Sequence, residues 1–232
     1  FYMYDGGTRV LPCNVKKYVF NDINLTNQEQ IFAGTNEGFD EIWWFYPSAD
    51  SDTNDRYVVY NYMQKIWYYG TIARTAWLDS GIRDFPVAAT NTKNLVLHES
   101  GLDDAETATT SAISASITSA QFDLDDGHKF MLVSRMLPDI SFEGSTADSP
   151  VVTMSMSALQ NSGSGFNDPL SESGNSSGTV TRTASSPVEK FTEQIFLRVR
   201  GRQVSFKVES SSTGIAWQLG SPRIDMRPDG RR

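Results

Sequence analysis

The chain has 232 residues, of which 39% are hydrophobic and 12% aromatic, and it carries a net charge of −8. This composition excludes a wholly disordered chain, and the acidic balance argues against a general nucleic-acid binder, which needs a basic face. No run of about eighteen apolar residues is present, so the sequence predicts no membrane-spanning helix. The sequence begins at Phe1 with no initiator Met or signal peptide, so we expect the C-terminal part of a longer protein.

Residues 1–101 contain short runs of aromatic and β-branched residues between turn-forming clusters, a pattern typical of consecutive antiparallel strands. Four strands in meander order make one propeller blade, so the sequence predicts one full blade at about residues 30–71. Partial blades are expected on either side, the earlier one ending at Tyr18–Phe20 and the later one starting near Phe85. The strands of the full blade are predicted at Gln30–Thr35, Ile42–Tyr46, Arg56–Tyr62 and Ile66–Thr71.

Residues 102–232 also read as strands, and no long amphipathic helix is indicated. We therefore expect an all-β chain in which propeller-blade material is followed by an antiparallel β-sandwich-like domain. A Gly/Ser-rich stretch at about residues 161–186 is interpreted as a flexible surface loop, or as a loop that orders against a neighbouring subunit. Strands are predicted at 107–119, 130–137, 140–142, 151–157 and 215–219, with a hairpin formed by 194–200 and 204–209.

The charge is unevenly distributed along the chain. From Pro187 onward there are nine basic and five acidic residues, or +4, which leaves −12 for the rest. Within that basic part, Arg198, Arg200 and Arg202 are spaced by two residues, so on a regular strand they share one face. The row is a candidate contact for carboxylates or other anions, including those of a neighbouring subunit. The alternative is a solvated sheet face.

Several acidic motifs are weighed as sites and interpreted as turns. Asp50–Asp55 resembles the opening of a calcium loop, but its sixth position is Asp55 instead of Gly and its twelfth is Asn61 instead of Glu. The stretch at 123–128 contains Asp-Gly, a strong hairpin signal. No metal or cofactor is therefore expected.

No catalytic motif is recognised. The only two histidines, His98 and His128, lie in no metal-ligand or Ser/His/Asp spacing. Paired carboxylates remain the best enzyme hypothesis, because glycoside hydrolysis needs only two of them at the right separation. A sugar-stacking platform is conceivable from Trp43, Trp44, Trp67, Tyr68 and Tyr69, but their positions inside predicted strands favour packing in a core or between blades. We expect a protein that is not an enzyme.

Several stretches, taken together, resemble the C-terminal region of the tail nozzle proteins of short-tailed bacteriophages, also called tail tubular protein B or stabilisation proteins. The stretches that carry the resemblance are EIWWFYPS (41–48), NDRYVVYNY (54–62), IWYYGT (66–71), RTAWLD (74–79), LPDISF (137–142), PVEKFTEQ (187–194), RVRGRQ (198–203) and SPRIDMRPDGRR (221–232). Their order spans nearly the whole chain, although complete nozzle proteins are several times longer.

This resemblance implies a structural protein of the phage virion. Such nozzles are rings of six copies with propeller and sandwich domains, and they form the distal tube through which the genome is ejected. The implied partners are further copies of the chain, the tail adaptor and tail fibre proteins, and double-stranded DNA that passes without sequence-specific binding. The alternative function is a phage tail protein that binds carbohydrate or depolymerises polysaccharide.

Overall fold

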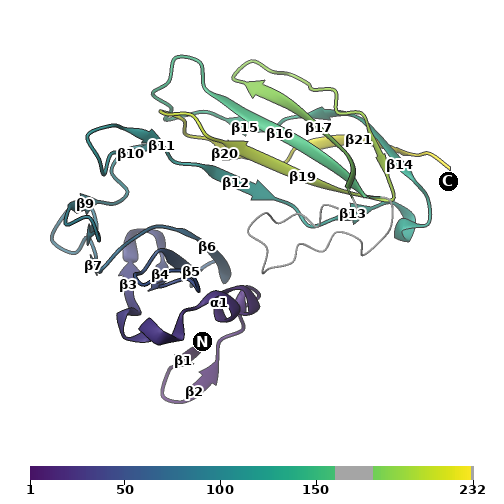
Figure 1. Ribbon diagram of the computed structural model, residues 1–232. Helices are drawn as coiled ribbons and strands as arrows, with labels where there is room; N and C mark the ends of the chain where they lie inside the picture. Colours follow the sequence, from purple (N-terminus) through teal and green to yellow (C-terminus); the bar gives the residue numbers. More distant parts are fainter. Residues whose placement is uncertain (160–179, 231–232) are drawn as a thin grey trace. The chain divides into compact units, whose positions relative to one another are not determined.

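The computed structural model describes residues 1–159 and 180–230 (Figure 1). The described residues form mainly strands, with one short α-helix and three short 3-10 helices. The all-β class predicted from the sequence is confirmed. The chain divides into two compact units, the first formed by Phe1–Ser100 and the second beginning at Gly101. No helix among the described residues is long and apolar enough to cross a membrane.

The first unit contains three antiparallel sheets, β1-β2, β3-β4-β5-β6 and β7-β8-β9. Its elements are β1 (Tyr2–Tyr4), β2 (Thr8–Val10), α1 (Lys16–Asp22), η1 (Leu25–Gln30), β3 (Phe32–Asn36), η2 (Glu37–Phe39), β4 (Glu41–Tyr46), β5 (Arg56–Asn61), β6 (Ile66–Thr71), β7 (Ala76–Leu78), β8 (Val87–Ala89) and β9 (Leu95–Leu97).

The sheet β3–β6 is the meander that the sequence predicts, with each strand paired antiparallel to the next. Because successive side chains point to opposite faces of a strand, the run at 43–46 supplies apolar groups to both faces. On one face Trp43 and Phe45 pack with Trp77 of β7. On the other face Tyr46 packs with α1 and the N-terminal segment. The meander is therefore covered on both faces.

The predicted strand end at Tyr18–Phe20 is wrong, because these residues lie in the helix α1. Tyr18 and Val19 are buried against the meander, and the ring of Tyr18 stacks on Tyr69 of β6 with centroids 4.0 Å apart. Burial of this short apolar pair against the sheet has overridden the local preference of aromatic and β-branched residues for strands.

The second unit contains a five-stranded sheet, β12-β19-β16-β17 with β13 also paired to β19, and a three-stranded sheet, β18-β14-β21, besides two small two-stranded sheets. Its elements are β10 (Asp103–Asp104), β11 (Ser111–Ala112), β12 (Ala115–Thr118), β13 (Phe122–Asp123), η3 (Asp125–Gly127), β14 (Met131–Leu137), β15 (Ile140–Ser141), β16 (Val151–Leu159), β17 (Val180–Glu189), β18 (Val199–Gly201), β19 (Gln203–Ser210), β20 (Gln218–Leu219) and β21 (Arg223–Pro228).

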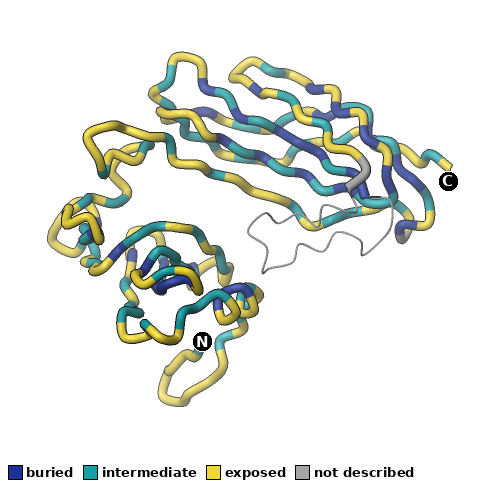
Figure 2. The backbone as a smooth tube through the Cα atoms, viewed as in Figure 1, coloured by how far each residue is buried: buried dark blue, intermediate teal, exposed yellow. Residues whose placement is uncertain are grey.

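The two larger sheets of this unit share one apolar core, which makes the pair sandwich-like. Met131, Val133 and Met136 of β14 pack with Met154 and Met156 of β16, and all five are fully buried. Along β16 and β19 buried residues recur at alternate positions for most of each strand, and Figure 2 shows these buried stretches running through the strands of the unit. Period-two alternation is what places one side of each strand in the core.

The predicted hairpin between 194–200 and 204–209 is wrong. β18 pairs with β14, whereas β19 pairs with β16 and β12, so the chain passes from one sheet to the other at Gly201–Gln203. A Cβ at Gly201 would lie 2.7 Å from the carbonyl oxygen of Leu159. Glycine therefore permits a close backbone approach at this crossing, where the sequence pattern indicates a turn.

Two further strand predictions need correction. The segment 107–119 forms β11 and β12, which belong to different sheets, and only the last two residues of 215–219 form a strand. Most of the loop predicted at about 161–186 lies outside the described residues, but its last part belongs to β17, which begins at Val180 and pairs with β16. The pairing with β16 explains why the mostly polar stretch at 181–186 forms a strand.

Candidate functional site: an arginine face on the second unit

Two of the three arginines singled out in the sequence share an outward face of the second unit. Arg198 and Arg200 are exposed, whereas Leu197, Val199 and Gly201 between and beside them are buried. Alternation along an extended strand accounts for this arrangement. The sheet therefore presents both guanidinium groups to solvent on the side opposite the core.

Arg202 is held differently, because it lies at the crossing between the sheets. Its Nη1 donates hydrogen bonds to the carbonyl oxygens of Gly127 (3.2 Å) and His128 (3.1 Å). The guanidinium carbon lies 5.0 Å from the centre of the Phe130 ring, and that of Arg200 lies 4.3 Å from the same ring. The hydrogen bonds of Arg202 thus hold the loop before β14 in place. Arg200 and Arg202 also share one cation–π partner, the ring of Phe130.

The strand register brings further arginines to the same face. Leu132 of β14 lies opposite Arg200 of β18 on one side and opposite Arg227 of β21 on the other. Neighbouring strands are roughly 4.8 Å apart, so the backbones of the two arginines are about 10 Å apart across the strand that separates them. Arg227 was not singled out in the sequence.

Two more arginines complete the row along β14 and β21. An irregularity in register between Val133 and Arg135 places Arg135 opposite Asp225, and farther along the pair Leu137 lies opposite Arg223. Since Met131, Val133 and Met136 point into the core, these four residues lie on the outward side. We call this surface the arginine face; its basic residues are Arg135, Arg198, Arg200, Arg223 and Arg227, and Leu132, Leu137 and Asp225 lie among them.

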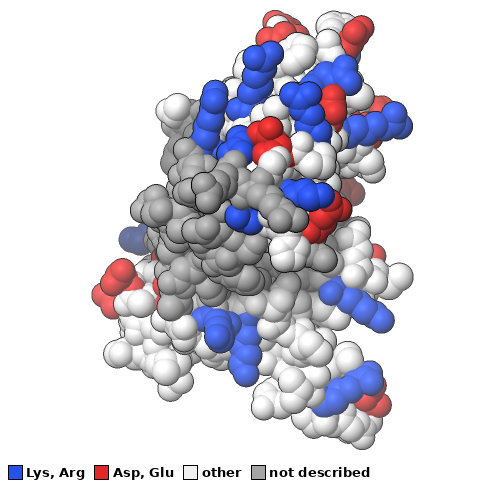
Figure 3. Space-filling view, turned by 90° about the vertical axis from the view of Figure 1, so that its right-hand side faces the viewer, with Lys and Arg blue, Asp and Glu red and all other residues white. Residues whose placement is uncertain are grey.

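Only part of this charge is neutralised within the unit. Nη2 of Arg135 lies 3.5 Å from a carboxylate oxygen of Asp225, and Nε of Arg200 lies 2.5 Å from one of Asp229. With five arginines and these two aspartates, the surface carries a formal charge of +3. No residue in the described part of the chain forms a hydrogen bond or ion pair with the three others, Arg198, Arg223 and Arg227. The upper part of Figure 3 shows Lys and Arg side chains crowded together with fewer Asp and Glu among them.

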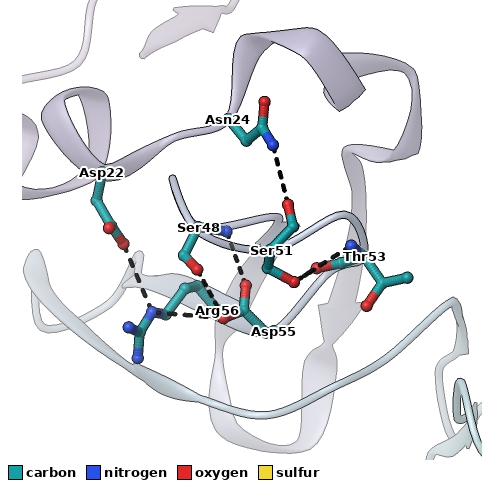
Figure 4. A network of polar contacts seen from close by, with 7 residues as sticks. All are labelled: Asp22, Asn24, Ser48, Ser51, Thr53, Asp55 and Arg56. Carbon is teal, nitrogen blue, oxygen red and sulfur yellow. Dashed lines mark hydrogen bonds and ion pairs between the residues drawn. The ribbon is translucent and has the colours of Figure 1, made fainter.

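The carboxylate of Asp55 links the two ends of the acidic loop at 48–55 (Figure 4). The carboxylate of Asp55 accepts hydrogen bonds from the backbone nitrogen (2.7 Å) and the hydroxyl (2.8 Å) of Ser48. Asp52 accepts one from the side chain of Asn27 at 3.1 Å. Within residues 1–159 and 180–230, no group of three or more His, Cys, Asp and Glu residues is arranged to hold a metal ion. These hydrogen bonds give Asp52 and Asp55 a structural role in the loop.

The carboxylates of Glu41 and Glu99 share a hydrogen-bond donor, the side-chain amide of Asn36. Glu41 is buried in β4 and accepts hydrogen bonds from the indole of Trp43 (2.9 Å) and the hydroxyl of Tyr68. The amide of Asn36 donates to both carboxylates, at 3.5 Å to Glu41 and 3.2 Å to Glu99. Partial burial, and then the charge of Glu41, raises the pKa of the Glu99 carboxyl.

The hydrogen bonds of Glu41 and Glu99 to Asn36 are a structural link within the first unit. Glycosidases place a sugar between two carboxyl groups, whereas here the Asn36 amide bonds to both. Glu99 follows β9 and Asn36 ends β3, so the hydrogen bonds tie the β7–β9 sheet to the meander. Sequence analysis missed the pair because its members are far apart in the chain; the only local sign is a Glu at the start of an aromatic strand.

The aromatic residues considered as a sugar platform pack inside the first unit. Trp43 is buried and stacks on Tyr57 and Trp77, with ring centroids 4.7 Å and 5.4 Å away. Trp44 lies on the opposite face of the sheet, against Phe1 and Trp67. Trp44 and Trp67 are half-buried, so the interpretation of the tryptophans as packing residues is confirmed. Of the two tyrosines in the same prediction, Tyr68 is half-buried, and Tyr69 is 46% exposed although it stacks on Tyr18. The arginine face therefore remains the strongest candidate for a functional surface.

Comparison with known protein families and with curated protein sequences finds no match to this chain.

Proposed function

We propose that the chain is a structural subunit of a short phage tail, part of the ring-shaped nozzle through which the genome is ejected. The proposal begins from the resemblance over the aromatic stretches at 41–71 and the C-terminal stretches at 187–232. In it, the meander β3–β6 serves as a propeller blade, and the second unit is the sandwich domain that follows. The subunit has no catalytic role and binds no cofactor.

The observation that best supports the proposal is the double-sided burial of the meander. An antiparallel sheet commonly packs one face on a core and leaves the other in water. Here one face packs against the N-terminal segment and α1, and the other against Trp77 of the next sheet. A propeller blade has this environment, because each blade stands between two others.

The β7–β9 sheet extends this layering. The cross-strand partners Trp77, Ala88 and Val96 share the face of this sheet that is turned toward the meander. The other face is entirely apolar, because the partners on either side of them are Ala76, Ala89 and Leu95 in one row and Leu78, Val87 and Leu97 in the other. Leu78, Leu95 and Leu97 in those rows are 59%, 79% and 57% exposed. Contiguous exposed apolar surface marks a place where another layer or molecule packs. This supports a blade series that continues beyond the described sheets.

Native mass spectrometry combined with negative-stain electron microscopy tests the proposal. We expect a ring of six copies with a central channel. A monomer at every concentration would contradict the nozzle function, and a monomer that shortens a bacterial surface polysaccharide would establish the depolymerase alternative. A Glu99→Gln variant separates these outcomes, because polysaccharide cleavage by the Glu41–Glu99 pair requires both carboxylates, whereas ring formation requires only that the first unit folds, which thermal unfolding of the variant shows.

A further inference from the structure

The arginine face carries a concentration of positive charge that the unit itself does not balance. Its formal charge is +3, whereas the chain as a whole is −8, so everything outside the face sums to −11. No two of these arginines are direct cross-strand partners, but like charges gathered on one face of a sheet still repel each other. Surfaces that serve only for solubility mix both signs. The segregation therefore indicates a surface that meets an anionic partner.

The residues among the arginines favour protein carboxylates over nucleic-acid phosphates. Asp225 lies on the face between Arg223 and Arg227 along β21, where it would repel a phosphate backbone. Leu132 and Leu137 present apolar surface between the charged rows. Protein interfaces combine apolar contact with arginine, and the planar guanidinium binds carboxylates in a bidentate manner. Nucleic-acid binding instead depends on neutralising many phosphates.

We infer that the arginine face binds the acidic surface of a second copy of this chain. This inference rests on the proposed function, in which identical subunits form a ring. Contacts in a ring are heterologous: one surface of a subunit meets a different surface of its neighbour. The face carries +3, and the remainder of the chain, at −11, supplies the surplus of carboxylates that a complementary second surface requires. Opposite charges also steer association and suppress wrong orientations.

The test compares single charge reversals that change the net charge equally. Arg198→Glu and Arg227→Glu alter the face at exposed positions that have no bonding partner in the described part of the chain. Arg182→Glu is the matched control, because Arg182 is exposed on β17 in the other large sheet. Thermal unfolding of each variant shows whether it folds as the wild type does. Sedimentation velocity at low and high salt measures the association of the intact chain.

We expect either reversal on the face to weaken association by about tenfold or more, and the control to associate as the wild type does. High salt should weaken the wild type more than the face variants, because screening removes the same attraction. Wild-type assembly by Arg198→Glu and Arg227→Glu would overturn the inference, as would equal weakening by Arg182→Glu. If the inference failed in either way but the wild type still formed a ring, the proposed function would remain supported. A wild type that stays monomeric would refute both the inference and the proposed function. A short duplex DNA whose binding depends on Arg227, with assembly unchanged, would assign the face to nucleic acid and also overturn the inference.

Discussion

Gly34 lies beneath the indole ring of Trp77, and we predict that Gly34→Ala destabilises the first unit. A Cβ built at Gly34 would lie 2.4 Å from Cδ1 and 2.8 Å from Cγ of Trp77. The indole is fixed where it is, because its Nε1 donates to the carbonyl oxygen of Thr35 at 2.7 Å and its ring stacks on Trp43. The added methyl group must therefore displace a side chain that joins two sheets.

The expected loss is about 2 kcal/mol in the free energy of unfolding. Forcing an extra carbon into a packed site costs about 1–3 kcal/mol, and weakening the indole hydrogen bond costs about 0.5–1.5 kcal/mol. The lower conformational entropy of alanine in the unfolded chain returns roughly 0.5–1 kcal/mol. Trp77→Ala should cost about 3 kcal/mol by loss of apolar packing.

Urea unfolding followed by tryptophan fluorescence measures these changes, because four of the five tryptophans lie in the first unit. If the clash with Trp77 is the cause, Gly34→Ala in a Trp77→Ala background should have almost no further effect, which gives an interaction energy of about 2 kcal/mol. Gly38→Ala is the control, since nothing lies within 4 Å of the added carbon, and its effect should stay within about 0.5 kcal/mol. Additive losses in the double variant would refute the reasoning.

Three other predictions follow from the same structure. Burial, and then the charge of Glu41, raises the pKa of the Glu99 carboxyl in the folded state above its ordinary value of 4.5, so the folded unit binds a proton at Glu99 more tightly than the unfolded chain does. The free energy of unfolding should therefore fall as pH rises from 4.5 through the raised pKa. Urea titrations of Glu99→Gln at several pH values should no longer show this fall. Asp55→Ala leaves the backbone nitrogen and the hydroxyl of Ser48 without their acceptor and should lower the free energy of unfolding by about 1–3 kcal/mol. If added Ca²⁺ raised the melting temperature of the wild type, the purely structural role of this loop would be contradicted. Gly201→Ala should lower the free energy of unfolding by at least about 2 kcal/mol, because the added carbon clashes with the backbone of β16. A thermal unfolding curve measured by circular dichroism that matches the wild type would count against this prediction.

The meander could be predicted from the sequence because its information is local. Runs such as the one at 42–46 combine aromatic residues with turn-forming clusters on both sides, and consecutive strands pair in chain order. The helix α1 could not be predicted in this way. Its apolar pair, Tyr18 and Val19, is too short to reveal a period, and only burial against the meander explains its conformation.

The sandwich was predictable as a class but not in its strand pairing. A glycine between two strand-like runs is a strong hairpin signal, and at Gly201 that signal is misleading. The glycine there serves a close approach to Leu159, a contact made by a distant strand. Local patterns determine which residues form strands, whereas the sheet that each strand joins depends on packing between distant segments.

The arginine face illustrates the same division between local and long-range information. An even spacing along a strand identifies Arg198 with Arg200 and would also identify Arg223 with Arg227, but the pairing of β18 and β21 with β14 is what places them on one face. The irregularity before Arg135 adds a fifth arginine to the face. Four of the nine basic residues that follow Pro187 thus lie with Arg135 on one face of a three-stranded sheet. Because like charges gathered on one face repel each other until a partner's carboxylates arrive, this concentration is better explained by assembly than by the stability of the isolated unit.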